Sequence, residues 1–329
     1  MSESYDLAAA VAVLDSARSV TVLCHVQPDA DTLGSGLALA QVLNRRGVPV
    51  RVAFAEPAAV PVSMRSLPGR EFIVAAKDVP REVDVLVAVD CGSAGRLGSL
   101  RDRLDGARVS LVLDHHSSNT RFGAVNVIDE TAESTAGLVA RVLDAWGEPI
   151  DRDIAHCLYA GLVTDTGSFK WARPGSHALA ERLLATGIDG PAITRTLMDT
   201  HPFAWLPMLA RVLSSAQLDR EAAGGAGLVY VFVRRADTAD VRSEEVESVI
   251  DLIRTSAEAQ VAAVFKETRS TSESWTVSLR SHDGANGVPG VDVSKVAMAL
   301  GGGGHRYAAG YSTTGTPESL VAALRAELG

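Results

Sequence analysis

The sequence predicts an α/β fold with two domains. The N-terminal domain is expected to contain a doubly wound, mainly parallel sheet, and the C-terminal domain to be a smaller α/β unit. Strand-like and helix-like segments alternate through the first half, and the strand-like segments are nearly continuous apolar runs. Such runs are typical of parallel strands that are buried on both faces. With 329 residues, the chain is long enough for about two domains.

The elements of the first half follow from these apolar runs and from helix-ending residues. Strands are expected at residues 19–25, 50–55, 83–89 and 109–113, and helices at 32–46, 134–146 and 153–163. Gly47 follows the first helix, where glycine often ends a helix because it adopts a left-handed conformation at little cost. Asp165, Thr166 and Gly167 are expected to end the last of these helices.

The second half begins with a segment, residues 174–222, that is expected to be mostly helical. A glycine-rich turn at 222–227 then precedes strands at 228–233, 261–266 and 275–280. Helices are expected at 243–256, at 292–300 and from Pro317 onward. We therefore place a first domain at residues 1–190, a helical linker at 191–226 and a second domain at 227–329.

The composition narrows the class of protein. A net charge of −9 is unfavourable for binding a long polyphosphate backbone, and 5% aromatic residues argue against an extended base-stacking groove. Small nucleotides and very short oligonucleotides remain possible ligands, because metal ions can supply local positive charge.

Three cysteines are too few for a disulfide framework. The N-terminal residues 1–6 are acidic, unlike a signal peptide, and no apolar stretch approaches ~18 residues, so we expect a cytoplasmic protein.

Side chains that can bind metals follow the ends of several apolar segments. They are Asp114-His115-His116 after the strand at 109–113, and His25, Asp29, Asp31, Asp90 and Asp165 after other segments. Because ligands of open α/β sheets bind at the carboxyl ends of the strands, we expect these side chains to converge on one edge. Imidazoles and carboxylates without a thiolate favour manganese, magnesium, cobalt or iron over structural zinc. A single aspartate after a strand, such as Asp90 or Asp165 alone, would instead be read as a turn or helix N-cap.

Two sets of motifs resemble the DHH phosphoesterase superfamily. Residues 25–35, Asp90, Asp114-His115-His116 and Asp165 resemble its four N-terminal motifs, and residues 291–294 with 301–310 resemble its DHH-associated C-terminal domain. The resemblance spans nearly the whole chain. Within the superfamily, the chain is most similar to the NrnA-type nano-RNases, which also dephosphorylate 3′-phosphoadenosine 5′-phosphate.

The resemblance implies a role for each of these residues. His25, Asp29 and Asp90 would hold one divalent cation, and Asp31, Asp90, His115 and Asp165 a second, so that Asp90 bridges the two. The expected metal is manganese, with magnesium or cobalt as alternatives. Asp114 would orient a histidine, and His116 would act beside the transferred phosphate. The substrate-binding residues would be Arg280, Gly302, Gly303, Gly304 and His305.

The resemblance also implies an activity. The expected protein is a two-metal phosphoesterase with its active site in a cleft between the domains. It would hydrolyse short oligoribonucleotides and linear dinucleotides to mononucleotides, or remove the 3′-phosphate of 3′-phosphoadenosine 5′-phosphate. Cyclic dinucleotides are a related substrate class. A homodimer is expected, whereas a membrane or a long nucleic acid is not expected as a partner.

Three alternatives compete with this activity. An inorganic pyrophosphatase shares similar metal motifs but would not be expected to carry the glycine-rich segment before His305. A long-strand DNA exonuclease would be expected to contain further nucleic-acid-binding modules. A nucleotide-binding sensor without turnover would be expected to have lost one or more carboxylates, whereas Asp29, Asp31, Asp90 and Asp165 are all present.

Overall fold

The computed structural model describes residues 6–268, 273–284 and 289–329. The chain forms two compact units, Met1–Thr200 and His201–Gly329. The predicted α/β class is confirmed, with a parallel sheet in the first unit and a separate mixed sheet in the second. The acidic residues 1–5 lie outside the described ranges, and the predicted linker at 191–226 stays a prediction. None of the helices in the described ranges is long and apolar enough to cross a membrane.

The first unit is built on a five-stranded parallel sheet in the order β2–β1–β3–β4–β5. The strands are β1 (Val20–Leu23), β2 (Val50–Ala53), β3 (Val83–Val89), β4 (Ala107–Asp114) and β5 (Val125–Ile128). β1 pairs with both β2 and β3, so the direction in which strands are added reverses at β1. In open α/β sheets this reversal marks the place where ligands bind beyond the carboxyl ends of the strands.

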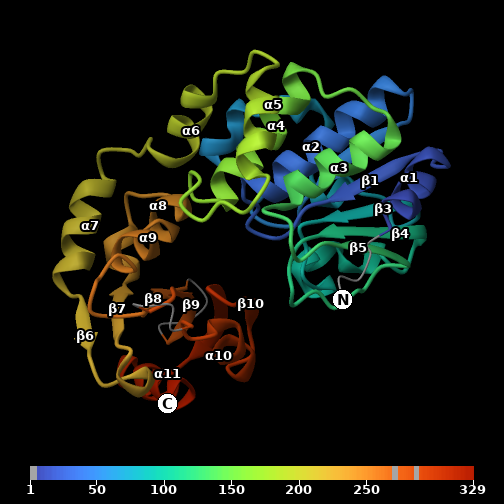
Figure 1. The fold of residues 1–329 in the computed structure, drawn as a ribbon. Coiled ribbons are helices and arrows are strands. Elements are labelled where there is room, and N and C mark those ends of the chain that lie inside the picture. The colour runs from blue at the N-terminus through green and yellow to red at the C-terminus, as the bar shows by residue number, and fades with distance from the viewer. Residues whose placement is uncertain (1–5, 269–272, 285–288) are drawn as a thin grey trace. The chain divides into compact units, whose positions relative to one another are not determined.

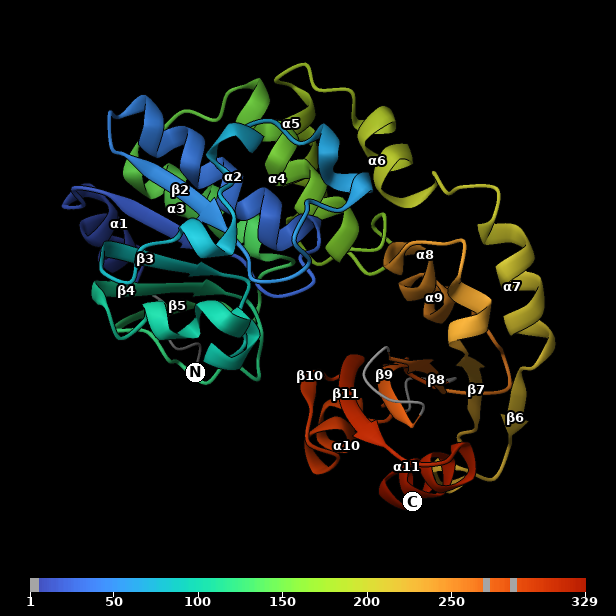
Figure 2. The ribbon, with the colours of Figure 1, turned by 180° about the vertical axis from the view of Figure 1, so that it is seen from behind.

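The two faces of this sheet are covered differently (Figures 1 and 2). One face packs against α1 (Leu7–Asp15), α2 (Ala30–Arg45) and α3 (Thr135–Trp146), and α4 (Arg152–Asp165) packs on α2 and α3 as a further layer. The other face packs against the 3-10 segment η4 (Ala94–Arg103), whose Leu97 and Leu100 are buried against the sheet. α5 (Ser176–Leu184) and α6 (Gly190–Met198) pack on α4, and the short turns η1 (Val62–Ser66), η2 (Arg70–Phe72) and η3 (Ala76–Asp78) follow β2.

Helices α2 and α4 approach each other unusually closely. A Cβ atom built on Gly34 of α2 would lie 2.4 Å from the backbone oxygen of Cys157 in α4. Only glycine therefore fits at this crossing without a shift of one helix. The close contact brings the N-terminal turn of α2 beside the C-terminal half of α4, which ends at Asp165.

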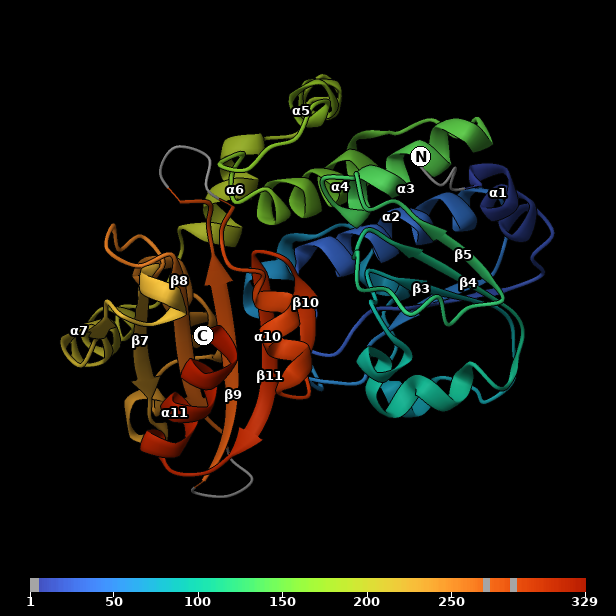
Figure 3. The same cartoon turned by 60° about the horizontal axis from the view of Figure 1, so that its bottom comes forward.

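The second unit contains a six-stranded mixed sheet in the order β10–β11–β9–β8–β7–β6. The strands are β6 (Gln217–Asp219), β7 (Leu228–Val233), β8 (Val261–Glu267), β9 (Ser274–Ser281), β10 (Gly303–His305) and β11 (Ala308–Thr314). α10 (Val293–Ala299) and α11 (Pro317–Leu328) cover one face (Figure 3). α7 (Trp205–Ser214) and α9 (Val249–Ile253) pack over β7 and β8 on the other. The remaining elements are α8 (Ser243–Glu247), η5 (Ala223–Gly225) and η6 (Arg235–Thr238).

The structure corrects the prediction at several places in this unit. The single helix expected at 243–256 is two short helices, α8 and α9, which meet at Ser248. The hydroxyl of Ser248 donates to the Glu245 carbonyl and accepts from the Trp205 indole, which fixes the chain at this junction. Strand β6 lies in the segment 174–222 that was expected to be mostly helical. Strands β10 and β11 were also not predicted, because the glycine and alanine residues at 301–310 have low strand propensity; pairing of β11 with β9 and of β10 with β11 places them in the sheet.

Candidate active site

The segment between β1 and α2 places three of the predicted ligands. Asp29 is the N-cap of α2, and its Oδ1 accepts from the backbone amides of Asp31 and Thr32 at 3.0 Å each. Its Oδ2 lies 3.4 Å from Nε2 of His25. One oxygen of Asp29 therefore caps the helix, and the other faces His25. Helix capping and cation binding by Asp29 are thus compatible.

Asp31 points into the protein and is fully buried. Its Oδ2 accepts from the amide of Thr135 at 2.7 Å and its Oδ1 from the amide of Ala136 at 2.8 Å. Both amides belong to the first turn of α3, where the helix dipole favours a negative charge. Burial, with the carboxylates of Asp90 and Asp165 nearby, nevertheless raises the pKa of Asp31 well above its usual range. A cation beside Asp31 would relieve the repulsion between its carboxylate and those of Asp90 and Asp165.

Asp90 follows β3 directly and lies at the middle of the cluster. Its Oδ2 is 3.4 Å from Nε2 of His25, and its Oδ1 is 3.7 Å from Nε2 of His115 and 3.6 Å from Nδ1 of His116. Its backbone is left-handed, with φ 57°, which is uncommon for a residue with a side chain and often found at functional sites. Burial alone would raise the pKa of Asp90, but the histidines hold it below its usual range.

His115 and Asp165 meet although they lie on different elements. Asp165 is the last residue of α4, and its Oδ2 lies 3.1 Å from Nε2 of His115. Burial alone would lower the pKa of His115, but Asp165, Asp90 and Asp31 raise it well above its usual range. In the same way, the carboxylates of Asp29 and Asp90 outweigh burial and raise the pKa of His25 to about 10.

Asp114 and His116 form a pair beside the cluster. Nδ1 of His116 lies 2.6 Å from Oδ1 of Asp114, which also accepts from the amide of His115 at 2.9 Å. Oδ2 of Asp114 accepts from the side-chain amide of Asn119 at 2.5 Å. Asp114 is buried and its Oδ1 holds Nδ1 of His116, an arrangement that suits a residue that orients His116.

Three overlapping groups of side chains in the described part of the first unit could each hold a metal ion, and Asp90 belongs to all of them. Two are the candidate cation sites: the ligand atoms of His25, Asp29 and Asp90 lie within 4.8 Å of one another, and so do those of Asp31, Asp90 and His115. The third group is Asp90 with the pair Asp114 and His116. Carboxylates and imidazoles are suitable ligands for divalent cations such as manganese, and buried carboxylates that repel one another need a cation among them. The residues present therefore fit a divalent-metal centre.

The second unit brings together the predicted substrate-binding residues. His305 of β10 pairs with Ala308 of β11, which pairs on its other side with Arg280 of β9. Residues that are paired across neighbouring strands project from the same face of a sheet, so Arg280 and His305 share one face. Gly303 and Gly304 lie in β10 itself, and Gly302 precedes it. Lys266, which was not singled out from the sequence, projects from that face as well and donates to Ser278 Oγ at 2.8 Å.

Two further residues that contact the cluster in the first unit could not be recognised in the sequence. The hydroxyl of Thr135 donates to Oδ1 of Asp90 at 2.9 Å. Nη2 of Arg96, in η4, lies 2.9 Å from Nδ1 of His25. Neither residue follows a strand end or was assigned a role from the sequence, and tertiary packing brings both to the cluster.

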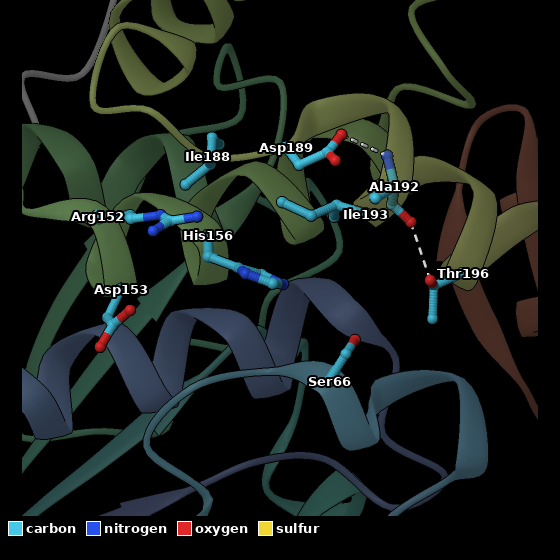
Figure 4. Close-up of a pocket in the computed structure, with 9 residues that line it drawn as sticks. All are labelled: Ser66, Arg152, Asp153, His156, Ile188, Asp189, Ala192, Ile193 and Thr196. Carbon is cyan, nitrogen blue, oxygen red and sulfur yellow. Dashed lines mark hydrogen bonds between the residues drawn. The ribbon is translucent and has the colours of Figure 1, made fainter.

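A pocket with a volume of about 260 Å³ lies elsewhere, at the N-terminal end of α4 (Figure 4). Arg152, Asp153 and His156 line it from α4, with residues of η1 and α6 opposite. Two polar side chains at its wall are engaged within α6: Asp189 accepts from the Ala192 amide, and Thr196 donates to the Ala192 carbonyl. The pocket contains none of the predicted site residues, and Asp165 lies at the opposite end of α4.

Comparison with known protein families gives two matches that together cover most of the chain. Residues 19–162 match the DHH family, N-terminal domain, and residues 225–328 match the DHHA1 domain. The first match contains all the predicted metal-binding residues except Asp165, and the second contains all the predicted substrate-binding residues.

Individual relatives are similar over nearly their whole length. The chain is 30% identical to the bifunctional oligoribonuclease and PAP phosphatase NrnA of Thermus thermophilus, over 94% of this chain and 90% of that protein. It is 25% identical to a probable protein of the same name from Streptococcus mutans, over 90% of this chain and 89% of the other. Among solved structures, an exopolyphosphatase-related protein from Bacteroides fragilis superposes with a TM-score of 0.84. It is 22% identical, and the match covers 98% of this chain and 95% of that chain, so the likeness concerns the fold.

Proposed function

The chain belongs to the DHH family, and from that premise we propose that it is a two-cation phosphoesterase of short oligoribonucleotides and nucleoside bisphosphates. It would hydrolyse oligoribonucleotides and linear dinucleotides to mononucleotides and remove the 3′-phosphate of 3′-phosphoadenosine 5′-phosphate. Two relatives that carry both activities in their names support this substrate class. Cyclic dinucleotides are a further candidate substrate within the proposal.

The observation that carries the proposal is the place of Asp90 in both groups of potential ligands. Its two oxygens face different histidines, His25 on one side and His115 on the other. A carboxylate between two sets of ligands is the arrangement that a two-metal hydrolase requires. The proposed sets are His25, Asp29 and Asp90 for one cation, and Asp31, Asp90, His115 and Asp165 for the other.

When bound, the two cations, which we propose to be manganese, would stabilise charge on phosphoryl oxygens and lower the pKa of water. The protein's own residues contribute the remaining steps. His116 holds one ring proton toward Asp114 through Nδ1, which leaves Nε2 to donate a proton to the leaving oxygen. Burial alone would lower the pKa of His116, but Asp114 raises it, which favours the protonated form of the ring that proton donation requires. Asp114 keeps the ring in place.

The second unit would bind the nucleotide. Arg280 can pair with two oxygens of one phosphate through its planar guanidinium. Gly302, Gly303 and Gly304 carry no side chain, so a phosphate could approach their backbone closely. The Gly302 amide itself donates to the Ala297 carbonyl, and His305 lies on the same face as Arg280. We also propose a homodimer, which light scattering on the purified protein tests directly.

The proposal is tested by measuring hydrolysis of four substrates in parallel with Mn²⁺. They are a 5′-phosphorylated diribonucleotide, 3′-phosphoadenosine 5′-phosphate, a cyclic dinucleotide and pyrophosphate. Asp90→Asn is the test variant. Asp84→Asn is the matched control, because Asp84 is also a largely buried carboxylate of the β3 region but pairs with Arg18 and Arg108 instead.

We expect turnover of the diribonucleotide or of the bisphosphate by the wild type and by Asp84→Asn, and its loss in Asp90→Asn. Turnover of pyrophosphate alone would identify an inorganic pyrophosphatase and contradict the proposal. Nucleotide binding without turnover of any of the four substrates would identify a sensor and would contradict it as well.

A further inference from the structure

Thr135, the first residue of α3, contacts two of the candidate cation ligands at once. Its backbone amide donates to Oδ2 of Asp31 at 2.7 Å, and its hydroxyl donates to Oδ1 of Asp90 at 2.9 Å. Both carboxylates belong to the group that also contains His115. The side chain of Thr135 is completely buried, so the protein around it decides where the hydroxyl proton points. One residue thus links two carboxylates that come from different elements.

The orientation of the Asp90 carboxylate matters more than that of an ordinary ligand. Its Oδ2 faces His25 at 3.4 Å, and its Oδ1 faces His115 at 3.7 Å. A carboxylate that serves two cations has to keep one oxygen toward each of them. The last torsion of an aspartate side chain is intrinsically broad, so an outside contact is needed to hold that orientation. The bond from Thr135 to Oδ1 supplies such a contact.

Threonine is well suited to this task. Its branched Cβ restricts χ1, so the hydroxyl direction is set by the backbone of α3. That backbone is fixed by the N-cap Ser134, whose Oγ accepts from the amide of Gly137 at 3.0 Å, and by the two amides that hold Asp31. A hydroxyl that donates to a carboxylate also makes a stronger bond than one between neutral groups.

We propose that Thr135 is a positioning residue of the cation centre, whose hydroxyl holds Asp90 with one oxygen turned toward each cation. The proposal rests on the proposed two-cation function. Because Thr135 acts through Asp90 and touches no reacting atom, its first effect is on cation affinity. Turnover falls as a consequence.

The test is calorimetric titration of the metal-free full-length protein with Mn²⁺ alone. Thr135→Val removes the hydroxyl and keeps the branched shape, and Thr135→Ser keeps the hydroxyl and removes the methyl group. Thr196→Val is the matched control, because Thr196 loses a hydroxyl that donates to the Ala192 carbonyl in α6, away from the cluster. Thermal unfolding of the metal-free variants reports on any general loss of stability.

We expect Thr135→Val to weaken Mn²⁺ binding by roughly 10–100-fold, the range found when residues that support metal ligands are changed. Thr135→Ser is expected to bind like the wild type, and so is Thr196→Val. A general structural role would instead lower the unfolding temperature of the metal-free protein without separating serine from valine in the titration.

Two results would overturn the proposal: wild-type affinity in Thr135→Val, or affinity in Thr135→Ser as weak as in Thr135→Val. If the valine variant does not fold, Thr135→Ala replaces it, since alanine removes the hydroxyl without placing a methyl group against Asp90. If the wild type does not bind Mn²⁺, both the proposed function and this inference are contradicted. If every variant binds Mn²⁺ as the wild type does, only the inference is contradicted.

Discussion

Gly161 of α4 lies directly against Asp31 of α2. A Cβ atom built on Gly161 would lie 2.6 Å from Oδ1 of Asp31 and 2.8 Å from Cβ of Ala136. The absence of a side chain at Gly161 is therefore what lets Asp31 reach the first turn of α3, where its oxygens accept from two backbone amides. A packing contact between two helices thus fixes the position of a candidate cation ligand.

Gly161→Ala is accordingly expected to affect both stability and cation binding. The added methyl group forces a shift of Asp31 or of α3, and overpacking of this kind costs about 1–3 kcal/mol of unfolding free energy. Urea unfolding of the metal-free variant and titration with Mn²⁺ measure the two effects. Wild-type behaviour in both measurements would mean that the contact between Gly161 and Asp31 is looser than the structure shows.

His116→Ala is expected to reduce the turnover number and to leave Mn²⁺ binding nearly unchanged. The reason is that His116 is assigned to proton donation, and a positioned acid typically contributes about 100-fold or more to the rate. Steady-state hydrolysis of a diribonucleotide gives kcat and KM, and a titration gives the cation affinity. A loss of cation affinity as large as that expected for Asp90→Asn would reassign His116 to the metal ligands.

Arg280→Lys is expected to raise KM roughly 10-fold with a small change in kcat. Lysine keeps the positive charge but cannot pair with two phosphate oxygens through a planar group, so ground-state binding is weakened. The variant is compared with Lys295→Gln, which removes a mostly exposed charge of α10. An unchanged KM in Arg280→Lys, or an equal effect in both variants, would argue against phosphate recognition by Arg280.

Asp84 is expected to make stability depend on acid pH. Hydrogen bonds from Arg108 and Arg18 hold the pKa of Asp84 well below its usual range in the folded protein. A carboxylate with a lowered folded pKa stabilises the fold above its unfolded pKa of about 4, and that contribution is lost as the pH falls below it. Thermal unfolding of the wild type and of Asp84→Asn should differ most at neutral pH and converge below about pH 4. A difference that grows with acidity would contradict this account.

Strands β1, β2, β3 and β4 could be predicted from their apolar residues, whereas the four-residue edge strand β5, which contains Asn126, was not predicted. β3 has the predicted bounds, and the ends of β1, β3 and β4 place His25, Asp90 and Asp114 at one edge of the sheet. The rule that ligands bind beyond the carboxyl ends of parallel strands therefore predicts that these three residues lie together.

The remaining features depend on contacts that a linear pattern does not contain. The left-handed backbone of Asp90, the amides of α3 that hold Asp31, and the contacts of Thr135 and Arg96 all arise from tertiary packing. β10 and β11 are rich in glycine and alanine and lack the apolar alternation of a strand. The junction at Ser248 depends on Trp205, which is distant in the sequence.

The most direct test of the central claim is the cation stoichiometry of the active protein. Metal-free protein is titrated with Mn²⁺ while hydrolysis of a 5′-phosphorylated diribonucleotide is followed in the same samples, for the wild type and for Asp90→Asn. A two-cation centre bridged by Asp90 predicts two ions bound per chain, activity that rises with the second ion, and loss of both properties in Asp90→Asn. Full hydrolysis by metal-free protein, or by Asp90→Asn, would contradict it.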